Sequence, residues 1–86
     1  MPRICEFFGI AIYMYYREHQ PPHFHAIYGD EEALVAIESL SIVAGRLSPR
    51  AIGLVMEWAS LHKDELLEDW HLAESKLPLT RIDPLR

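Results

Sequence analysis

The chain has 86 residues, of which 50% are hydrophobic and 24% charged, a composition typical of one globular domain and not of a disordered tail. The formal net charge of −5 argues against nucleic-acid binding, which draws much of its affinity from basic side chains, and the single cysteine excludes an internal disulfide. Because the sequence shows neither a signal peptide nor a run of roughly 20 apolar residues, we expect a soluble, cytoplasmic protein with one domain over residues 1–86.

The first half of the chain predicts short β-strands. Apolar and polar residues alternate, or β-branched and aromatic residues dominate, in five stretches: residues 4–8, 9–16, 23–28, 33–37 and 42–47. Residues 9–16 are apolar on both faces, as an interior strand would be, whereas residues 4–8 form either an edge strand or an extended lead-in. Turns are expected at residues 29–31 and, more weakly, at 39–41. Four or five short strands joined by tight turns favour an antiparallel meander over about residues 4–47.

The second half predicts helix. Ser48 can cap a helix and Pro49 suits its first position, while apolar residues recur at spacings of three and four beyond them. We expect one unbroken helix over about residues 49–75; the alternative is a break at residues 62–64, with Asp64 capping a second helix. The tail, residues 77–86, should be extended. The fold class is therefore α+β, with an antiparallel sheet covered on one face by a long C-terminal helix.

A helix of that length would extend past a sheet of short strands. The overhang would include Leu66 and Trp70, whose apolar side chains would be exposed unless a second molecule covered them. Exposed apolar patches of this kind mark interfaces. We therefore expect either a small partner protein or a second copy of the chain to bind there.

One loop carries an unusual density of reactive side chains. Three of the five histidines lie between His19 and His25, and a proline pair directly precedes His23. His23 and His25 are two residues apart, so in a strand their rings point to the same side. Histidine is the side chain best suited to proton transfer near neutral pH and is also the commonest metal ligand. The segment from Arg17 to His25 is therefore the candidate functional site.

Three interpretations of this site remain open. In the first, His23 and His25 are an acid–base pair for metal-independent RNA cleavage, Arg17 stabilises developing negative charge, and Glu18 or Tyr15 orients a ring.

In the second interpretation, His23 and His25 bind a divalent metal such as zinc, with His19 or Glu18 as a further ligand. In the third, the histidines simply pack and form hydrogen bonds, and the prolines only set the direction in which the strand enters the sheet.

Three segments resemble a bacterial family known as domain of unknown function 4160: PRICEFFGI, MYYREHQPPHFHA and EWASLHKDELLEDW. The resemblance covers the chain from about Pro2 to Leu85. The family pattern falls on Tyr15, Tyr16, Pro21, Pro22, His23, His25, Glu57, Trp58, His62, Glu65 and Trp70. One departure is the turn before the last strand, which often contains glycine in this family but reads Glu38-Ser39-Leu40-Ser41 here.

The resemblance implies no established activity. Members of the family often lie beside a second small gene in pairs that resemble toxin–antitoxin modules. By that resemblance the chain would be the toxin-side member, neutralised by a cognate partner protein.

Overall fold

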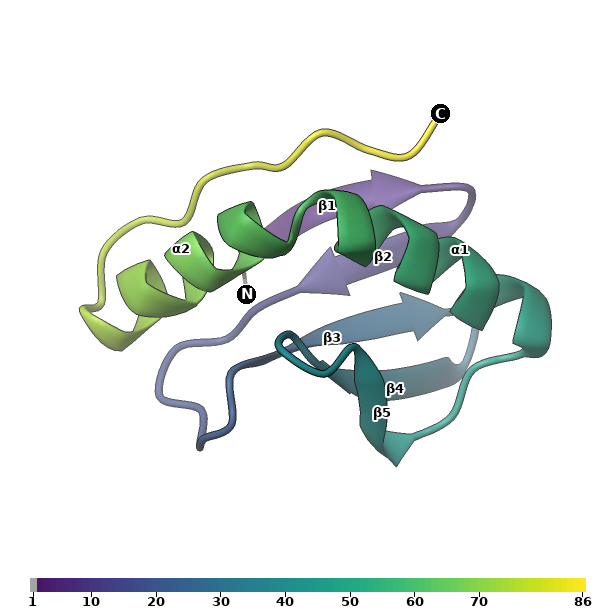
Figure 1. Ribbon diagram of the computed structural model, residues 1–86, viewed down its shortest axis with the longest axis horizontal. Coiled ribbons are helices and arrows are strands. Elements are labelled where there is room, and N and C mark those ends of the chain that lie inside the picture. The colour runs from purple at the N-terminus through teal and green to yellow at the C-terminus, as the bar shows by residue number, and fades with distance from the viewer. Residues whose placement is uncertain (1) are drawn as a thin grey trace.

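The computed structural model describes residues 2–86, which form five strands and two helices (Figure 1). In chain order these are β1 (Arg3–Phe7), β2 (Ile10–Tyr13), β3 (His23–Tyr28), β4 (Glu31–Ala36), β5 (Ser41–Gly45), α1 (Pro49–Leu61) and α2 (Lys63–Glu74). Neighbouring strands all pair antiparallel in the order β1-β2-β3-β4-β5. Both helices lie on one side of this sheet (Figure 1). The predicted α+β meander is confirmed, and residues 3–7 are a true edge strand.

The strand register separates a core face of the sheet from an open face. Phe24 pairs with Val35, and both are fully buried; the ring of Phe24 meets that of Trp58 in α1 edge to face at 5.9 Å. His25 pairs with Tyr13 on one side and Leu34 on the other, so these three side chains share the opposite face. The start of β3 therefore carries its histidines on the face that α1 does not cover.

The long connection between β2 and β3 begins earlier than the sequence predicts. The expected strand over residues 9–16 ends at Tyr13, and residues 14–22 leave the sheet. Within this connection Arg17 has a φ of 64° and the Gln20–Pro21 peptide bond is cis. The early end of β2 leaves room for the connection to fold back beside β3.

The turn between β4 and β5 contains no glycine. Leu40 takes a φ of 52°, and its backbone N–H donates to the carbonyl oxygen of Ala36 at 2.9 Å. Positive φ is costly for most side chains, but Leu40 packs against the hydrophobic core. Apolar burial at this position therefore offsets the backbone cost.

The helical segment is divided, so the expectation of one unbroken helix is wrong. Ser48 caps α1 by accepting a hydrogen bond from the backbone N–H of Ala51, as the sequence predicts. At His62 the backbone turns to a φ of −123°, and α2 begins directly afterwards. The break falls where the alternative placed it, but His62 and not Asp64 is the N-cap residue, and its side chain forms no capping hydrogen bond.

The expected exposure of Leu66 and Trp70 is also wrong, since both are at most 2% exposed. The helix break redirects α2, and the C-terminal segment returns over the core along the β1 edge (Figure 1). The backbone N–H of Ile82 donates to the carbonyl oxygen of Ile4, and the indole N–H of Trp58 donates to that of Asp83. The chain therefore covers its own helix, and this pair of side chains is no basis for a partner interface.

The β1–β2 turn leads to a first prediction. Phe8 and Gly9 both have positive φ, at 49° and 81°, which is the geometry of a two-residue type I′ turn. Phe8 is 53% exposed and gains little from burial there, whereas Asn tolerates this backbone conformation well. Phe8→Asn should raise the free energy of unfolding by about 0.5–1 kcal/mol, measured by urea denaturation. Phe8→Ala is the control, and an Asn variant no more stable than the Ala variant would contradict the turn assignment.

The buried carboxyl of Asp69 leads to a second prediction. Burial raises its pKa, an effect that the hydrogen bond from the backbone N–H of Thr80 only partly offsets, and its Oδ2 has no partner. A folded-state pKa above the unfolded value means that ionised Asp69 costs stability near pH 7, and that this cost disappears as the pH falls through the folded pKa. Asp69→Asn should therefore gain stability relative to the wild type near pH 7 and lose that gain by about pH 4.

Urea unfolding of both proteins at the two pH values measures this difference. Asp30→Asn, in the exposed β3–β4 turn, is the control and should show no such pH dependence. A difference between the Asp69 variant and the wild type that is equal at both pH values would contradict the account.

Candidate metal site

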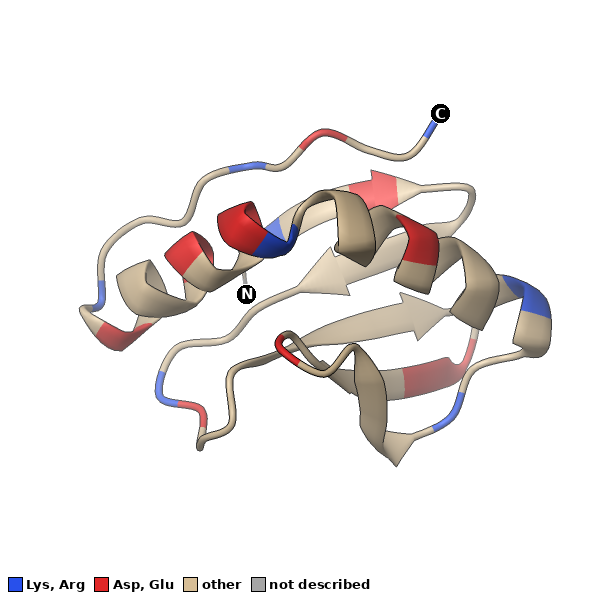
Figure 2. Ribbon diagram, in the orientation of Figure 1, with Lys and Arg blue, Asp and Glu red and all other residues tan. Residues whose placement is uncertain are grey.

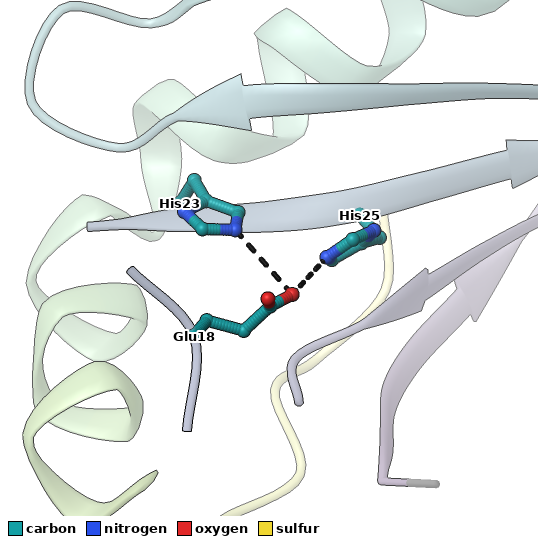
Figure 3. A group of neighbouring side chains, drawn as sticks. All are labelled: Glu18, His23 and His25. Atoms are coloured by element: carbon teal, nitrogen blue, oxygen red, sulfur yellow. Dashed lines mark hydrogen bonds and ion pairs between the residues drawn. The ribbon is translucent and has the colours of Figure 1, made fainter. Parts of the chain in front are cut away.

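Two histidines from β3 and one glutamate from the preceding connection meet at one point (Figure 3). The Nε2 atom of His25 lies 2.5 Å from Oε1 of Glu18, and the Nε2 atom of His23 lies 3.5 Å from the same oxygen. The two rings stand on one side of the strand, as the spacing predicts, with their centroids 5.4 Å apart. Potential ligand atoms from all three residues lie within 4.8 Å of one another.

The ring of His25 is held from both ends. Its Nδ1 lies 2.9 Å from Oε2 of Glu32 in β4, while its Nε2 faces Glu18. The ring also meets Tyr15 edge on, at a centroid distance of 4.4 Å. A neutral imidazole has one N–H, so both carboxylate contacts are hydrogen bonds together only when the ring carries two protons.

The ring of His23 is anchored at one nitrogen only. Its Nδ1 lies 2.9 Å from the carbonyl oxygen of Pro21, which can only accept, so Nδ1 carries the proton. The ring packs against the indole of Trp70 with centroids 5.2 Å apart and is 6% exposed. Its Nε2 is buried and has no hydrogen-bond partner. This nitrogen faces Glu18 at 3.5 Å, where it offers a lone pair when the ring is neutral and forms an ion pair only when it also carries a proton.

Glu18 is the ionised member of the group. Burial alone would raise the pKa of its carboxyl, but the hydrogen bond and charge of His25, together with the charge of His23, outweigh burial and lower that pKa. A carboxylate and two imidazole nitrogens are the donor types that zinc and similar transition metals prefer. The group is therefore suited to a divalent cation near neutral pH.

A pocket of about 270 Å³ lies beside this group, between the β2–β3 connection and the end of α2. Glu18 lines it, and so does Trp70, which packs against His23. Although both histidines are nearly buried, at 6% and 9% exposure, Glu18 thus connects them to a solvent-filled space. An ion at the group would be reachable from the pocket.

The structure brings together some of the predicted site residues and separates others. Tyr15 contacts His25, and Glu18 contacts both histidines. Arg17 is exposed and lines the pocket, where it touches neither imidazole through a polar contact in residues 2–86. His19 is exposed and lies outside the group, so of the two residues considered as a further metal ligand, only Glu18 lies close to both His23 and His25.

Glu32 is the contact that sequence reasoning missed. The sequence predicts a turn over residues 29–31 and assigns the neighbouring Glu32 no role, whereas Glu32 belongs to β4 and reaches His25. The two-residue connection between Tyr28 and Glu31 fixes the register of the β3–β4 hairpin and places Ile27 opposite Glu32. Since side chains of paired residues share a face, the register is the signal that could have found it.

The helix residues of the family pattern lie mostly elsewhere. Trp58 is fully buried in the core, and the ring of His62 lies 5.6 Å from it. The Nδ1 atom of His62 contacts Oε1 of Glu65 at 2.5 Å, as their spacing on a helix predicts. Neither His62 nor Glu65 belongs to the group of Glu18, His23 and His25.

Residues 9–71 match the model of a known protein family, a domain of unknown function (DUF4160). The chain belongs to the DUF4160 family. The matched region includes β2 to β5, α1, most of α2 and all three members of the group Glu18, His23 and His25. No curated protein and no solved structure matches the chain. Neither helix within residues 2–86 is long and apolar enough to cross a membrane.

Proposed function

We propose that this small protein binds a divalent transition metal ion, such as zinc, through Glu18, His23 and His25. The observation that supports it is the convergence of two imidazole Nε2 atoms on one carboxylate oxygen, with one of those nitrogens buried and unpartnered. Two histidines with one glutamate form a ligand set found in hydrolytic zinc sites. Ligand atoms around tetrahedral zinc lie about 2.0–2.2 Å from the metal, so small shifts of these side chains would accommodate it.

The contacts around the outer nitrogens support the same assignment. The Nδ1 atoms of His23 and His25 face the carbonyl oxygen of Pro21 and the carboxylate of Glu32, respectively. Metal-bound histidines almost always donate their second N–H to a carbonyl or carboxylate, which fixes the tautomer and the ring orientation. Both rings are therefore already oriented with Nε2 toward the shared point.

An acid–base pair for RNA cleavage fits this geometry less well. Such a pair needs its two imidazole nitrogens free to face a phosphodiester from two sides, whereas both Nε2 atoms here face Glu18. Two carboxylates, Glu18 and Glu32, adjoin His25 and would repel a phosphate in the absence of a metal. A bound metal ion would offset this negative charge, because the carboxylate of Glu18 would be one of its ligands.

A purely structural role explains less of the geometry. Hydrogen bonding satisfies His25, but the buried Nε2 of His23 forms no hydrogen bond and has only the 3.5 Å contact with Glu18. An unsatisfied buried polar atom costs about 1–3 kcal/mol, so an apolar ring would serve packing against Trp70 better. A bound metal ion would give Nε2 of His23 a partner.

Three protein ligands leave at least one position of a tetrahedral site for water or a small molecule. Zinc bound in this way lowers the pKa of a coordinated water and polarises a bound carbonyl or phosphoryl group. The protein's own residues would orient the ligands, and the adjoining pocket would admit the small molecule.

The toxin-like role implied by the family resemblance stays a hypothesis that is separate from the metal site. Arrest of bacterial growth on expression, relieved by the product of an adjacent gene, would support it. Normal growth during verified expression of folded protein would count against it.

Metal binding leads to a third prediction. Isothermal titration of zinc into protein purified without a histidine tag should show one site per chain. Glu18→Gln and His23→Gln should each weaken zinc binding by at least about 100-fold, because each removes one of three ligands. His19→Gln and His71→Gln, which alter exposed histidines outside the group, are the matched controls and should bind as the wild type does. Equal affinity in all four variants would refute the site.

The hydrogen bond from His25 to Glu32 leads to a fourth prediction. Glu32→Gln keeps an acceptor near Nδ1 but removes its charge, so the ring becomes a weaker ligand. Zinc affinity should fall by roughly 10- to 100-fold, the usual effect of losing an outer partner of a metal-bound histidine. Glu6→Gln, on the same face of the sheet but in the edge strand β1, two strands away from β3, is the control. Unchanged affinity in Glu32→Gln would show that this contact does not support metal binding.

A further inference from the structure

The pocket beside the proposed metal site contains four charged side chains and one tyrosine: Arg17, Glu18, Glu74, Lys76 and Tyr15. They come from two places that are far apart in the sequence, the β2–β3 connection and the end of α2. Figure 2 shows the same mixture of blue and red segments where these two parts of the chain approach each other. The formal charges sum to zero, so the electrostatic potential inside the pocket depends on which of these side chains already have partners elsewhere in the protein.

Both acidic side chains have partners. The carboxylate of Glu18 faces the two histidines, and Oε2 of Glu74 accepts a hydrogen bond from the side-chain amide of Gln20 at 2.8 Å. Neither cation is similarly engaged: within residues 2–86, no carboxylate forms an ion pair with Arg17 or Lys76. The pocket of an acidic protein therefore presents two free positive charges next to a cation site.

The wall of the pocket contains a further unused donor. Trp70 lines the pocket, is 2% exposed, and its indole N–H has no hydrogen-bond partner. A buried N–H without compensation is unfavourable, so an acceptor that reached this side chain would be stabilised by it. Both the free charges and the free donor are thus complementary to an anionic acceptor.

The size of the pocket limits that anion. Its volume of about 270 Å³ lies just below the range of roughly 300–1,000 Å³ that holds drug-sized ligands. A polymer such as RNA could place at most a small part of itself inside. The space suits a compact molecule with one oxyanion group.

We propose that the pocket binds a small oxyanion, a carboxylate or a phosphate group, that contacts the metal held by Glu18, His23 and His25 and is anchored by Arg17 and Lys76. The inference rests on the proposed metal site. Arginine and lysine form charge-assisted hydrogen bonds with both groups, and an open zinc position accepts oxygen from either. The protein would therefore act on, or sense, a small anionic molecule and not a nucleic acid.

Cobalt(II) provides the test, since its absorption spectrum reports both metal binding and a change of ligand. The full chain is first titrated with cobalt alone, and then inorganic phosphate or acetate is added to the loaded protein in separate series. Both the wild type and the double variant R17Q/K76Q should bind cobalt equally well. The dissociation constant for the preferred anion should be about tenfold higher in R17Q/K76Q, since two charge-assisted contacts are lost.

A double variant with the same charge change, R50Q/R86Q, is the control, because neither Arg50 nor Arg86 lines the pocket. It should bind the anion as the wild type does. A stronger response to phosphate would identify a phosphate ligand, and a stronger response to acetate would identify a carboxylate; either result supports the inference. Cobalt binding without any anion response, or equal weakening in both double variants, would overturn the inference and leave the metal site intact. Failure to bind cobalt would overturn both.

Discussion

The orientation of two imidazole rings at the start of β3 is the constraint on which the site depends. Each ring is held by its Nδ1 atom, His23 through the carbonyl oxygen of Pro21 and His25 through the carboxylate of Glu32. Both Nε2 atoms then face Oε1 of Glu18. Contacts at the outer nitrogens thus orient the inner nitrogens without a metal, which would reduce the cost of ordering the proposed ligands if a metal binds.

Two other parts of the fold hold the two imidazole rings in place. The β3–β4 hairpin places Glu32 beside His25, and the break at His62 directs α2 so that Trp70 closes over His23. The C-terminal segment in turn covers α2, partly through the hydrogen bond from Thr80 to Asp69. Parts of the chain that contribute no ligand therefore determine how deeply the ligands are buried and where the pocket opens.

The sequence predicts the sheet well because strand signals are local. Alternation and turn residues identified the strands, and the two-residue spacing of His23 and His25 correctly put both rings on one side. The helix break, the burial of Leu66 and Trp70, and the roles of Glu18 and Glu32 were harder to predict. The first two depend on contacts between distant residues, the tail on the helices and α2 on the β2–β3 connection. The contacts of Glu18 and Glu32 with His25 are closer in sequence, but they depend on how the connection folds back and on the register of β4 with β3. Amphipathic spacing identifies a helix but not the segment that covers it.

Diffraction from crystals of zinc-loaded protein, recorded at the zinc absorption edge, tests the central claim most directly. The account predicts one anomalous peak per chain, about 2.0–2.2 Å from Nε2 of His23, Nε2 of His25 and a carboxylate oxygen of Glu18, with both Nδ1 contacts preserved. A peak at other residues, or no peak while Glu18 still bridges the two rings, would contradict it.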